Sequence, residues 1–312
     1  MIAETRWIKA GDLARLLGLA EDEVTRYLPA DLLDGLDYLS LDDAEAGAVR
    51  KRALRIVRDP KLTAAGPAMI GRWERGWGEI LERVRRQGVS EASLAPQYFR
   101  HDVLRLGGRY IRANRTGFEP RLYAAMRAVL FADLFAGVDQ VTEFGCGTGH
   151  NLLQLHRIFP NLRLTGCDWA APSQELVGLI AASEDAQMIG VRFDMGILEG
   201  REDLQIGAGA GVMTVHALEQ LGSRFEPFLD YLVAARPAVA LHIEPIVELY
   251  DAADPFDAPA IAYHKKRGYL AGFLPALEAR AAAGQIEILK SHRSGFGSTF
   301  HEAYSIVVWR AV

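Results

Sequence analysis

Three glycines at alternate positions are the clearest chemical signal in the chain. Gly145, Gly147 and Gly149 follow the apolar run "QVTEF" and open the helical stretch "HNLLQLHRIF". Glycine permits positive φ and lets a ligand approach the backbone closely. The N-terminus of the following helix carries partial positive charge, which suits an anionic or electron-rich ligand group. The stretch therefore predicts a ligand-binding turn between a strand and a helix.

Two carboxylates accompany this turn. Glu143 lies just before it, and Asp168 ends the apolar run "LTGCD", nineteen residues beyond Gly149. A carboxylate at that place accepts hydrogen bonds from the 2′- and 3′-hydroxyls of a ribose. A dinucleotide site is expected to read G-x-G-x-x-G, whereas the glycines here read G-x-G-x-G. The spacing favours a nucleoside-containing ligand other than a dinucleotide.

Short apolar runs alternate with helical stretches from about residue 119 onward. The runs are "DQVTEFG", "LRLTGCD", "GVRFD", "AGVMTVH", "AVALHIE", "IEIL" and "YSIVVW". Strands that alternate with helices form a parallel sheet covered on both faces. The last two runs are joined by "KSHRSGFGSTFHE", which leaves no room for a crossover helix and predicts an antiparallel pair. We expect an α/β domain over residues 119–312, with a seven-stranded, mostly parallel sheet that ends in an antiparallel hairpin.

Residues 1–118 are expected to form a helical N-terminal extension. Amphipathic patterns cover residues 11–28, 41–59 and 71–88. The expected buried stripe of the third pattern consists of Trp73, Trp77, Ile80, Leu81 and Val84. The extension is too large to be a tag, so we expect it to supply a lid, an acceptor pocket or the surface of a homodimer.

Composition excludes several classes of protein. The chain has 312 residues, a formal net charge of -5 and two cysteines, Cys146 and Cys167, which we expect to be buried fillers. The acidic balance argues against a nucleic-acid partner, and the cysteine count excludes a disulfide scaffold. No cluster has metal-ligand spacing, since His242 and Glu244 lack a third ligand. The apolar stretches are too short for a signal peptide or a membrane span, so a cytoplasmic protein is expected.

The motif "EFGCGTG" followed by "GCD" resembles that of the class I, Rossmann-like S-adenosylmethionine-dependent methyltransferases. That family's sheet also has seven strands with an antiparallel final pair. The stretches "QYFR…GGRYI", "ALEQLG", "HIEPIVELYD" and "KKRGYL" are similar to a bacterial group of sugar and small-molecule methyltransferases. The resemblance implies S-adenosyl-L-methionine as the methyl donor. It also implies a polar small-molecule acceptor, with methylation of a hydroxyl of a sugar or similar metabolite.

The same resemblance implies which residues contact the donor. Asp168 would bind the ribose, Asp194 the adenine amino group, and the glycine turn the methionine moiety. The full expected set is Glu143, Gly145, Cys146, Gly147, Gly149, Asp168, Trp169, Asp194, Met195 and Val215.

A hydroxyl acceptor must lose a proton, so a general base is expected near the methyl-donor face. His216 directly follows the fourth strand and is the first candidate, with Glu219 as a residue that orients it. Glu244 is the second candidate, and His264 and His301 lie in later segments. Each has a structural alternative, as a capping or core histidine or as a hydrogen-bonded buried acid.

Two basic stretches are candidates for binding the acceptor. In "YHKKRGYL", Tyr263, Lys265 and Arg267 form either an anion clamp for a phosphate or carboxylate, or an ordinary solvated face. In "RLGGRYIRANR", Arg109, Tyr110 or Arg112 either closes the pocket or binds a carboxylate, or the arginines of this stretch snorkel to solvent from a helix.

Three other functions are compatible with the same motifs. A protein or RNA methyltransferase would keep the donor site and use the extension to hold a macromolecule. A non-catalytic S-adenosylmethionine-binding module would keep the site without a base, and an NAD enzyme would prefer a dinucleotide.

Overall fold

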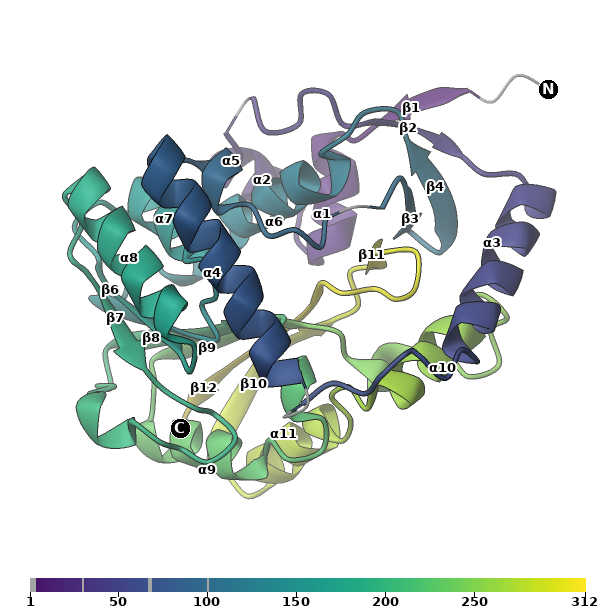
Figure 1. Cartoon of the computed structure of the whole chain (residues 1–312). Helices are drawn as coiled ribbons and strands as arrows, with labels where there is room; N and C mark the ends of the chain where they lie inside the picture. Colours follow the sequence, from purple (N-terminus) through teal and green to yellow (C-terminus); the bar gives the residue numbers. More distant parts are fainter. Residues whose placement is uncertain (1–3, 30, 67–68, 100) are drawn as a thin grey trace.

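Seven strands form the main sheet and place the glycine turn near its centre. The structure is a computed structural model that describes residues 4–29, 31–66, 69–99 and 101–312; Arg100 of "QYFR" lies outside these ranges. The strand order is β10-β12-β9-β8-β5-β6-β7 (Figure 1). The strands are β5 (Gln140–Phe144), β6 (Arg163–Asp168), β7 (Met188–Arg192), β8 (Ala210–Val215), β9 (Val239–Glu244), β10 (Ile286–His292) and β12 (Ser305–Ala311).

The pairing of these strands confirms the predicted sheet. Strands β9, β8, β5, β6 and β7 run parallel to one another. Strand β12 lies antiparallel between β9 and β10. The ligand-binding edge of such a sheet is the one formed by the carboxyl ends of its parallel strands.

Side chains alternate between the two faces of the sheet, as the two-residue period of a strand requires. In β8, Met213 and Val215 pack into one apolar cluster, whereas Val212 packs into the other. The first cluster contains residues of α6 (Phe118–Leu134), α7 (His150–Ile158) and α8 (Ala171–Glu184). The second contains residues of α9 (Glu226–Ala235) and α11 (Phe273–Ala282). Helices therefore cover both faces.

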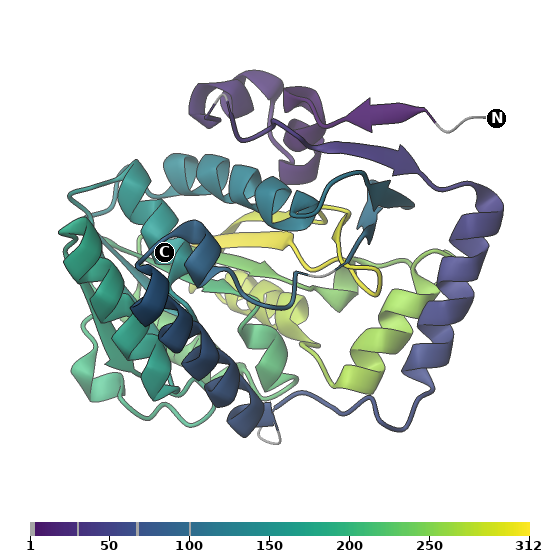
Figure 2. The ribbon, with the colours of Figure 1, turned by 45° about the horizontal axis from the view of Figure 1, so that its top comes forward.

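The N-terminal extension contains the expected helices and also a small sheet that the sequence did not predict. Its helices are α1 (Ala10–Leu17), α2 (Glu21–Tyr27), α3 (Asp43–Val57), α4 (Ile70–Gln87) and α5 (Glu91–Leu94). Its strands are β1 (Thr5–Trp7), β2 (Asp37–Ser40), β3 (Val103–Leu106) and β4 (Arg109–Ala113). Helices α1 and α2 lie along α6 (Figure 2), α4 packs on α8, and α3 packs on α10 (Ala258–Arg267).

The reading of "RLGGRYIRANR" as a helix is wrong. This stretch forms a hairpin of β3 and β4, with Gly107 and Gly108 at its turn. Both glycines have positive φ, 56° and 76°, which a two-residue turn of this kind requires. Two adjacent glycines between alternating apolar residues were the sequence signal for it.

A short C-terminal strand joins the small sheet. Strand β11 (Phe296–Gly297) pairs antiparallel with β3 and completes the order β1-β2-β4-β3-β11. The two predicted regions are thus joined by shared strand pairing, and their division at residues 118 and 119 stays a prediction. No helix of the described ranges is long and apolar enough to cross a membrane.

A buried group of four charges fastens these parts together. The Arg105 guanidinium of β3 contacts Asp257 at 3.0 Å and Glu302 at 3.4 Å. Arg293 contacts the same two carboxylates, each at 2.6 Å. Arg105, Asp257 and Glu302 are essentially inaccessible to solvent. The two positive and two negative charges neutralise one another across segments that lie far apart in the sequence.

Replacement of Arg105 is expected to destabilise the fold. In Arg105→Met, two buried carboxylates share only Arg293, so the free energy of unfolding should fall by about 3–5 kcal/mol in urea denaturation. Arg112→Met, on the neighbouring strand, removes an ion pair to Glu45 that is nearly half exposed and should cost less than about 1 kcal/mol. Equal losses in the two variants would contradict a stabilising role for the buried group.

Candidate functional site

A cavity of about 900 Å³ opens at the carboxyl ends of the central strands. Its floor is formed by the residues that follow β5, β6, β7 and β8, and helix α4 lies over it. Ligand pockets for drug-sized molecules commonly have about 300–1,000 Å³. The cavity therefore has the volume for a nucleoside-sized ligand together with a second small molecule.

The glycine turn forms one wall of this cavity. Gly145 has φ 74°, and a Cβ there would lie 2.4 Å from the Cβ of Ala217. Gly147 has φ 54°, and a Cβ there would lie 3.1 Å from the Trp77 ring. Gly145, Cys146 and Gly147 line the cavity. The backbone angle favours glycine at both positions, and at Gly145 the space available requires it.

Gly149 has a different task. It is the N-terminal cap of α7, and a Cβ there would lie 2.8 Å from the Cδ1 atom of Ile180 on α8. It is not among the cavity-lining residues. Its contribution is to let α7 and α8 approach each other.

Asp168 lines the cavity at the end of β6. Its Oδ2 accepts a hydrogen bond from the backbone N–H of Gly147 and its Oδ1 from that of Ala170, both at 2.9 Å. Burial raises the pKa of this carboxyl to about 6, so it is mostly ionised at pH 7. Each carboxylate oxygen accepts more than one hydrogen bond. Asp168 thus fastens the turn and retains acceptor capacity toward the cavity.

Asp194 and Met195 follow β7 and line the same cavity, as do Trp169 and Val215. The Asp194 Oδ1 accepts a hydrogen bond from the backbone N–H of Gly196 at 2.7 Å, which orders this loop. The structure thus brings these predicted residues together at one sheet edge.

Glu143 lies behind the turn and does not line the cavity. One of its oxygens accepts a hydrogen bond from Asn151, which does line the cavity, and the other is buried without a partner among the described residues. Burial raises the pKa of Glu143 to about 8. Glu143 can therefore act on a bound ligand only indirectly, by holding the Asn151 side chain in place.

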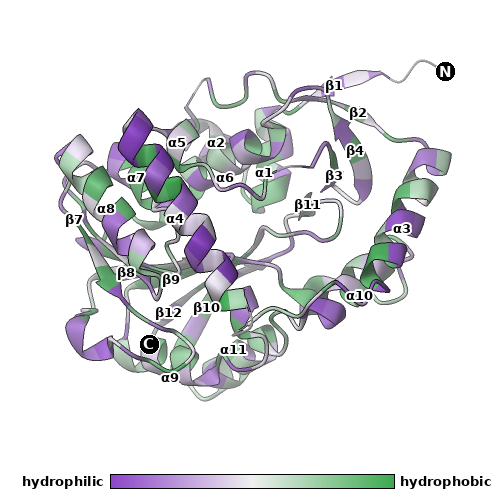
Figure 3. Ribbon diagram, in the orientation of Figure 1, coloured by the Kyte–Doolittle hydropathy of each residue, from purple (hydrophilic) through white to green (hydrophobic). Residues whose placement is uncertain are grey.

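Two tryptophans of α4 cover the turn, contrary to the expectation that they form the helix's buried stripe. That stripe consists of Ile80, Leu81 and Val84, whereas Trp73 and Trp77 are half-buried and line the cavity. Their rings stack at 5.4 Å between centroids. Figure 3 shows hydrophilic and hydrophobic residues interspersed along α4, so hydropathy alone did not separate the core-facing side from the cavity-facing side.

His216 follows β8 with φ 53°, a conformation that is strained for histidine and is common at functional sites. Its ring packs against Tyr304, with 4.8 Å between centroids. Nε2 is buried without a partner among the described residues. Burial lowers the pKa of His216 to about 4, against an opposing effect of the Ala303 backbone. The ring is therefore neutral at pH 7.

Glu119 is a cavity-lining acid that sequence reasoning missed. It lies in the first turn of α6, and its Oε1 accepts a hydrogen bond from the Tyr304 hydroxyl at 3.1 Å. Its Oε2 is buried without a partner in the described chain, and burial raises the pKa to about 7. In the sequence it was only an acid in a helical first turn, where acids are common.

The Glu244 carboxylate is not at the cavity, which corrects its assignment as a candidate base. It accepts hydrogen bonds from the backbone N–H groups of Ala217, Leu218 and Glu219, at 2.9, 3.0 and 3.3 Å. These groups begin the short 3-10 helix η3 (Leu218–Leu221). Glu244 thus shapes the segment that follows His216.

His264 also lies behind the cavity wall. Its Nε2 is 3.1 Å from the Nδ1 of His301, and His301 is the one of the pair that lines the cavity. Burial lowers the pKa of His264 to about 4 and that of His301 well below its usual value. His264 can orient His301, but it does not face the cavity.

Of the five residues predicted to bind the methyl acceptor, two line the cavity and three do not. Tyr263 and Arg267 line the cavity. Arg109 and Lys265 are exposed at positions outside it, and Tyr110 is buried beside Arg105. The helical period of α10 explains the first division, because residues 263 and 267 share a face that residue 265 does not.

Cys146 and Cys167 are buried free thiols, and burial raises the pKa of both. Among the residues that the structure describes, no group of three or more His, Cys, Asp or Glu side chains is placed to hold a metal ion.

Stability should depend on pH through the buried acids. Burial raises the pKa of Glu219 to about 8 and that of Glu244 to about 7, so each keeps a proton that the unfolded chain has released. The free energy of unfolding is therefore expected to fall as the pH rises from about 6.5 to 8. Buried neutral histidines oppose this trend only at the lower end of the window, since those of the unfolded chain, with a pKa of about 6.5, have lost most of their protons by about pH 7.5.

Urea denaturation at several pH values in this window measures the effect. The decrease of the free energy of unfolding with pH should be shallower in Glu219→Gln. It should be unchanged in Glu202→Gln, which alters an exposed acid. A stability that rises with pH over this range would contradict the buried, protonated state of these acids.

No protein-family model matches the chain, and no curated protein matches it. Solved structures do match. The [4+2]-cyclase SpnF gives a TM-score of 0.52 at 16% identity, over 80% of this chain and 97% of SpnF. The O-methyltransferase NcsB1 from neocarzinostatin biosynthesis, solved with S-adenosylmethionine and 2-hydroxy-5-methyl naphthoic acid, gives 0.42 at 17%, over 78% and 70%. The small RNA methyltransferase HEN1 gives 0.47 at 13%, over 65% and 28%.

Identities of this size establish a fold and not an activity. The strand order, the antiparallel placement of β12 and the likeness to SpnF agree on the architecture. The chain has the Rossmann-like fold expected of class I S-adenosylmethionine-dependent methyltransferases.

Proposed function

We propose that the chain transfers a methyl group from S-adenosylmethionine to a hydroxyl of a polar small molecule, such as a sugar or similar metabolite. The observation that carries this proposal is the convergence of the glycine turn, Asp168, Asp194 and His216 on one cavity. Fold alone would not carry it, since a [4+2]-cyclase shares the architecture.

The residues present fit this donor. Gly145 and Gly147 line the cavity with backbone alone, and Asp168 retains acceptor capacity for a ribose. Asp194 and Met195 lie beside the loop after β7, where a polar acceptor and an apolar surface suit an adenine ring. Glu143, with its unpartnered oxygen, supports Asn151 at the opposite end.

When bound, S-adenosylmethionine supplies an electrophilic methyl group. The task of the chain is then to align the acceptor oxygen and remove its proton. His216 is suited to the second part, because its ring is neutral at pH 7 and Nε2 has no partner among the described residues. The packing against Tyr304 holds the ring in place.

The remaining cavity wall supports a small acceptor. Rings of Tyr98, Tyr304 and Tyr263 alternate with the polar groups of Glu119 and His301. Aromatic faces beside a few placed polar groups are the usual lining of small-molecule sites. Helix α4 lies over the donor side, with Trp77 against Gly147, which favours a metabolite over a macromolecule.

The donor site is tested by replacement of Asp168. Loss of charge-assisted hydrogen bonds to a ribose should weaken S-adenosylhomocysteine binding to Asp168→Ala by about 2–4 kcal/mol in a calorimetric titration. Glu202→Ala, which alters an exposed acid that does not line the cavity, is the matched control. Equal affinities for wild type and Asp168→Ala would remove Asp168 from the site.

The reaction is tested with methyl-labelled S-adenosylmethionine and a lysate separated by size. Label is expected in the small-molecule fraction. His216→Asn, whose asparagine tolerates the left-handed backbone, should lower kcat by about 10²–10⁴-fold and leave the affinity for S-adenosylhomocysteine unchanged.

Other outcomes of the labelling have definite meanings. Label in protein or RNA would replace the metabolite acceptor with a macromolecule. An unchanged rate in His216→Asn would exclude it as the base. Stabilisation of the chain by NADH and not by S-adenosylhomocysteine would overturn the proposal.

A further inference from the structure

Arg267 is a buried cation without a carboxylate partner. It ends α10, is 8% exposed and lines the cavity. Its Nη1 donates to the Thr63 carbonyl and its guanidinium lies over the Tyr269 ring, 5.1 Å from the centroid, while its Nε is buried without a partner among the described residues. No carboxylate of the described chain lies within ion-pair distance of it. The ring contact offsets part of the cost of burying the charge, but a buried cation without an anion still calls for a reason.

The nearest acid does not supply the missing charge. Glu219 lines the same cavity and interacts electrostatically with Arg267, but burial and the neighbouring Glu244 raise the pKa of Glu219 to about 8. At neutral pH it is mostly protonated. Asp168 and Asp194 also line the cavity, but their oxygens accept hydrogen bonds from loop N–H groups near the donor turn. Glu79, on α4, lies near Gln97.

Three further arginines line the same cavity. Arg72 and Arg75 belong to the beginning of α4, and Arg224 follows η3. All three are exposed, and none forms an ion pair within the described chain. Elsewhere on the surface, arginines such as Arg85 and Arg157 do pair with acids. We call Arg72, Arg75, Arg224 and Arg267 the arginine corner.

The backbone brings Arg224 and Arg267 together. A Cβ on Gly222 would lie 2.7 Å from the Gly268 carbonyl oxygen, so their two segments touch. The loop at residues 62–66 contacts both, through Thr63 and Ala65 to Arg267 and through Gly66 to Arg224. Contacts of the fold therefore hold Arg224 and Arg267 next to each other.

We propose that the arginine corner binds an oxyanion carried by the acceptor, a phosphate or a carboxylate group. Guanidinium groups recognise both through paired hydrogen bonds, and such an anion would neutralise Arg267 where the chain does not. The inference rests on the proposed function only in making the bound anion part of the acceptor. Tyr263 and Tyr269, beside Arg267, then face the body of the same molecule.

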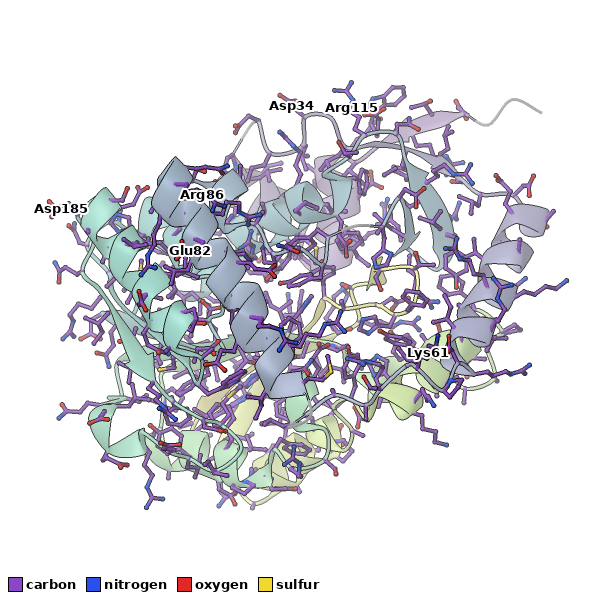
Figure 4. The ribbon with its side chains drawn as sticks, in the orientation of Figure 1. Asp34, Lys61, Glu82, Arg86, Arg115 and Asp185 are labelled. Carbon is purple, nitrogen blue, oxygen red and sulfur yellow. The ribbon has the colours of Figure 1, made fainter. Side chains whose placement is uncertain are left out.

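Calorimetric titration of the full chain tests this, with inorganic pyrophosphate and succinate as separate probes. We expect at least one of the two probes to bind. The affinity of the chain for that probe should fall about ten-fold or more in Arg224→Gln and in Arg267→Gln, since each variant loses a charge-assisted hydrogen bond to the anion. Arg224→Gln keeps the test valid if Arg267→Gln, which loses the contact to Thr63, does not fold. The control is Arg86→Gln, which alters an exposed arginine at the other end of α4 that forms no ion pair with the described residues (Figure 4).

The outcomes separate this inference from the proposed function. The stronger of the two probes identifies the phosphate or carboxylate class. No binding of either probe, or the same loss of affinity in Arg86→Gln, overturns the arginine corner. If S-adenosylhomocysteine binds and neither probe does, only this inference fails. If a probe binds with the expected losses and S-adenosylhomocysteine does not, the anion site stands and the donor assignment fails.

Discussion

The mutual neutralisation of Arg105, Arg293, Asp257 and Glu302 is the interaction on which the shape of the cavity depends. Arg105 belongs to the N-terminal hairpin, Asp257 precedes α10, and Arg293 and Glu302 flank β11. These segments carry side chains that line the cavity, among them Tyr263, His301 and Tyr304. Since buried charges tolerate little misalignment, the group fixes how the later loops meet the N-terminal sheet.

Around this fixed frame the cavity has two electrostatic parts. Near the carboxyl ends of the strands, burial keeps His216 neutral and Glu119 partly protonated, while Asp168 is mostly ionised. At the side of α10 and the start of α4, the cavity is lined by arginines. A neutral base near the strand ends and a cationic rim are suited to remove a proton from a ligand at one end and to hold it by the other.

The main sheet could be predicted from sequence because its signals are local. Each apolar run, the glycine spacing and the acid that directly ends β6 is a pattern contained within a few consecutive residues. The roles of Glu244 and Trp77 could not be predicted in this way. The Glu244 carboxylate turns toward the N–H groups of residues 217–219, and Trp77 meets a glycine seventy positions later. Such contacts depend on tertiary packing, which periodicity does not encode. The Gly107-Gly108 turn was local and was nevertheless overlooked.

Strand β11 has a consequence for the order of events during synthesis. The small sheet begins at Thr5 but is completed by Phe296 and Gly297, nearly three hundred residues later. These two residues are synthesised long after β3 and β4, so the N-terminal strands must wait with an unpaired edge on β3. The cavity is lined by both early and late segments. The chain therefore acquires its binding site only after residues 296 and 297 have emerged, and not segment by segment.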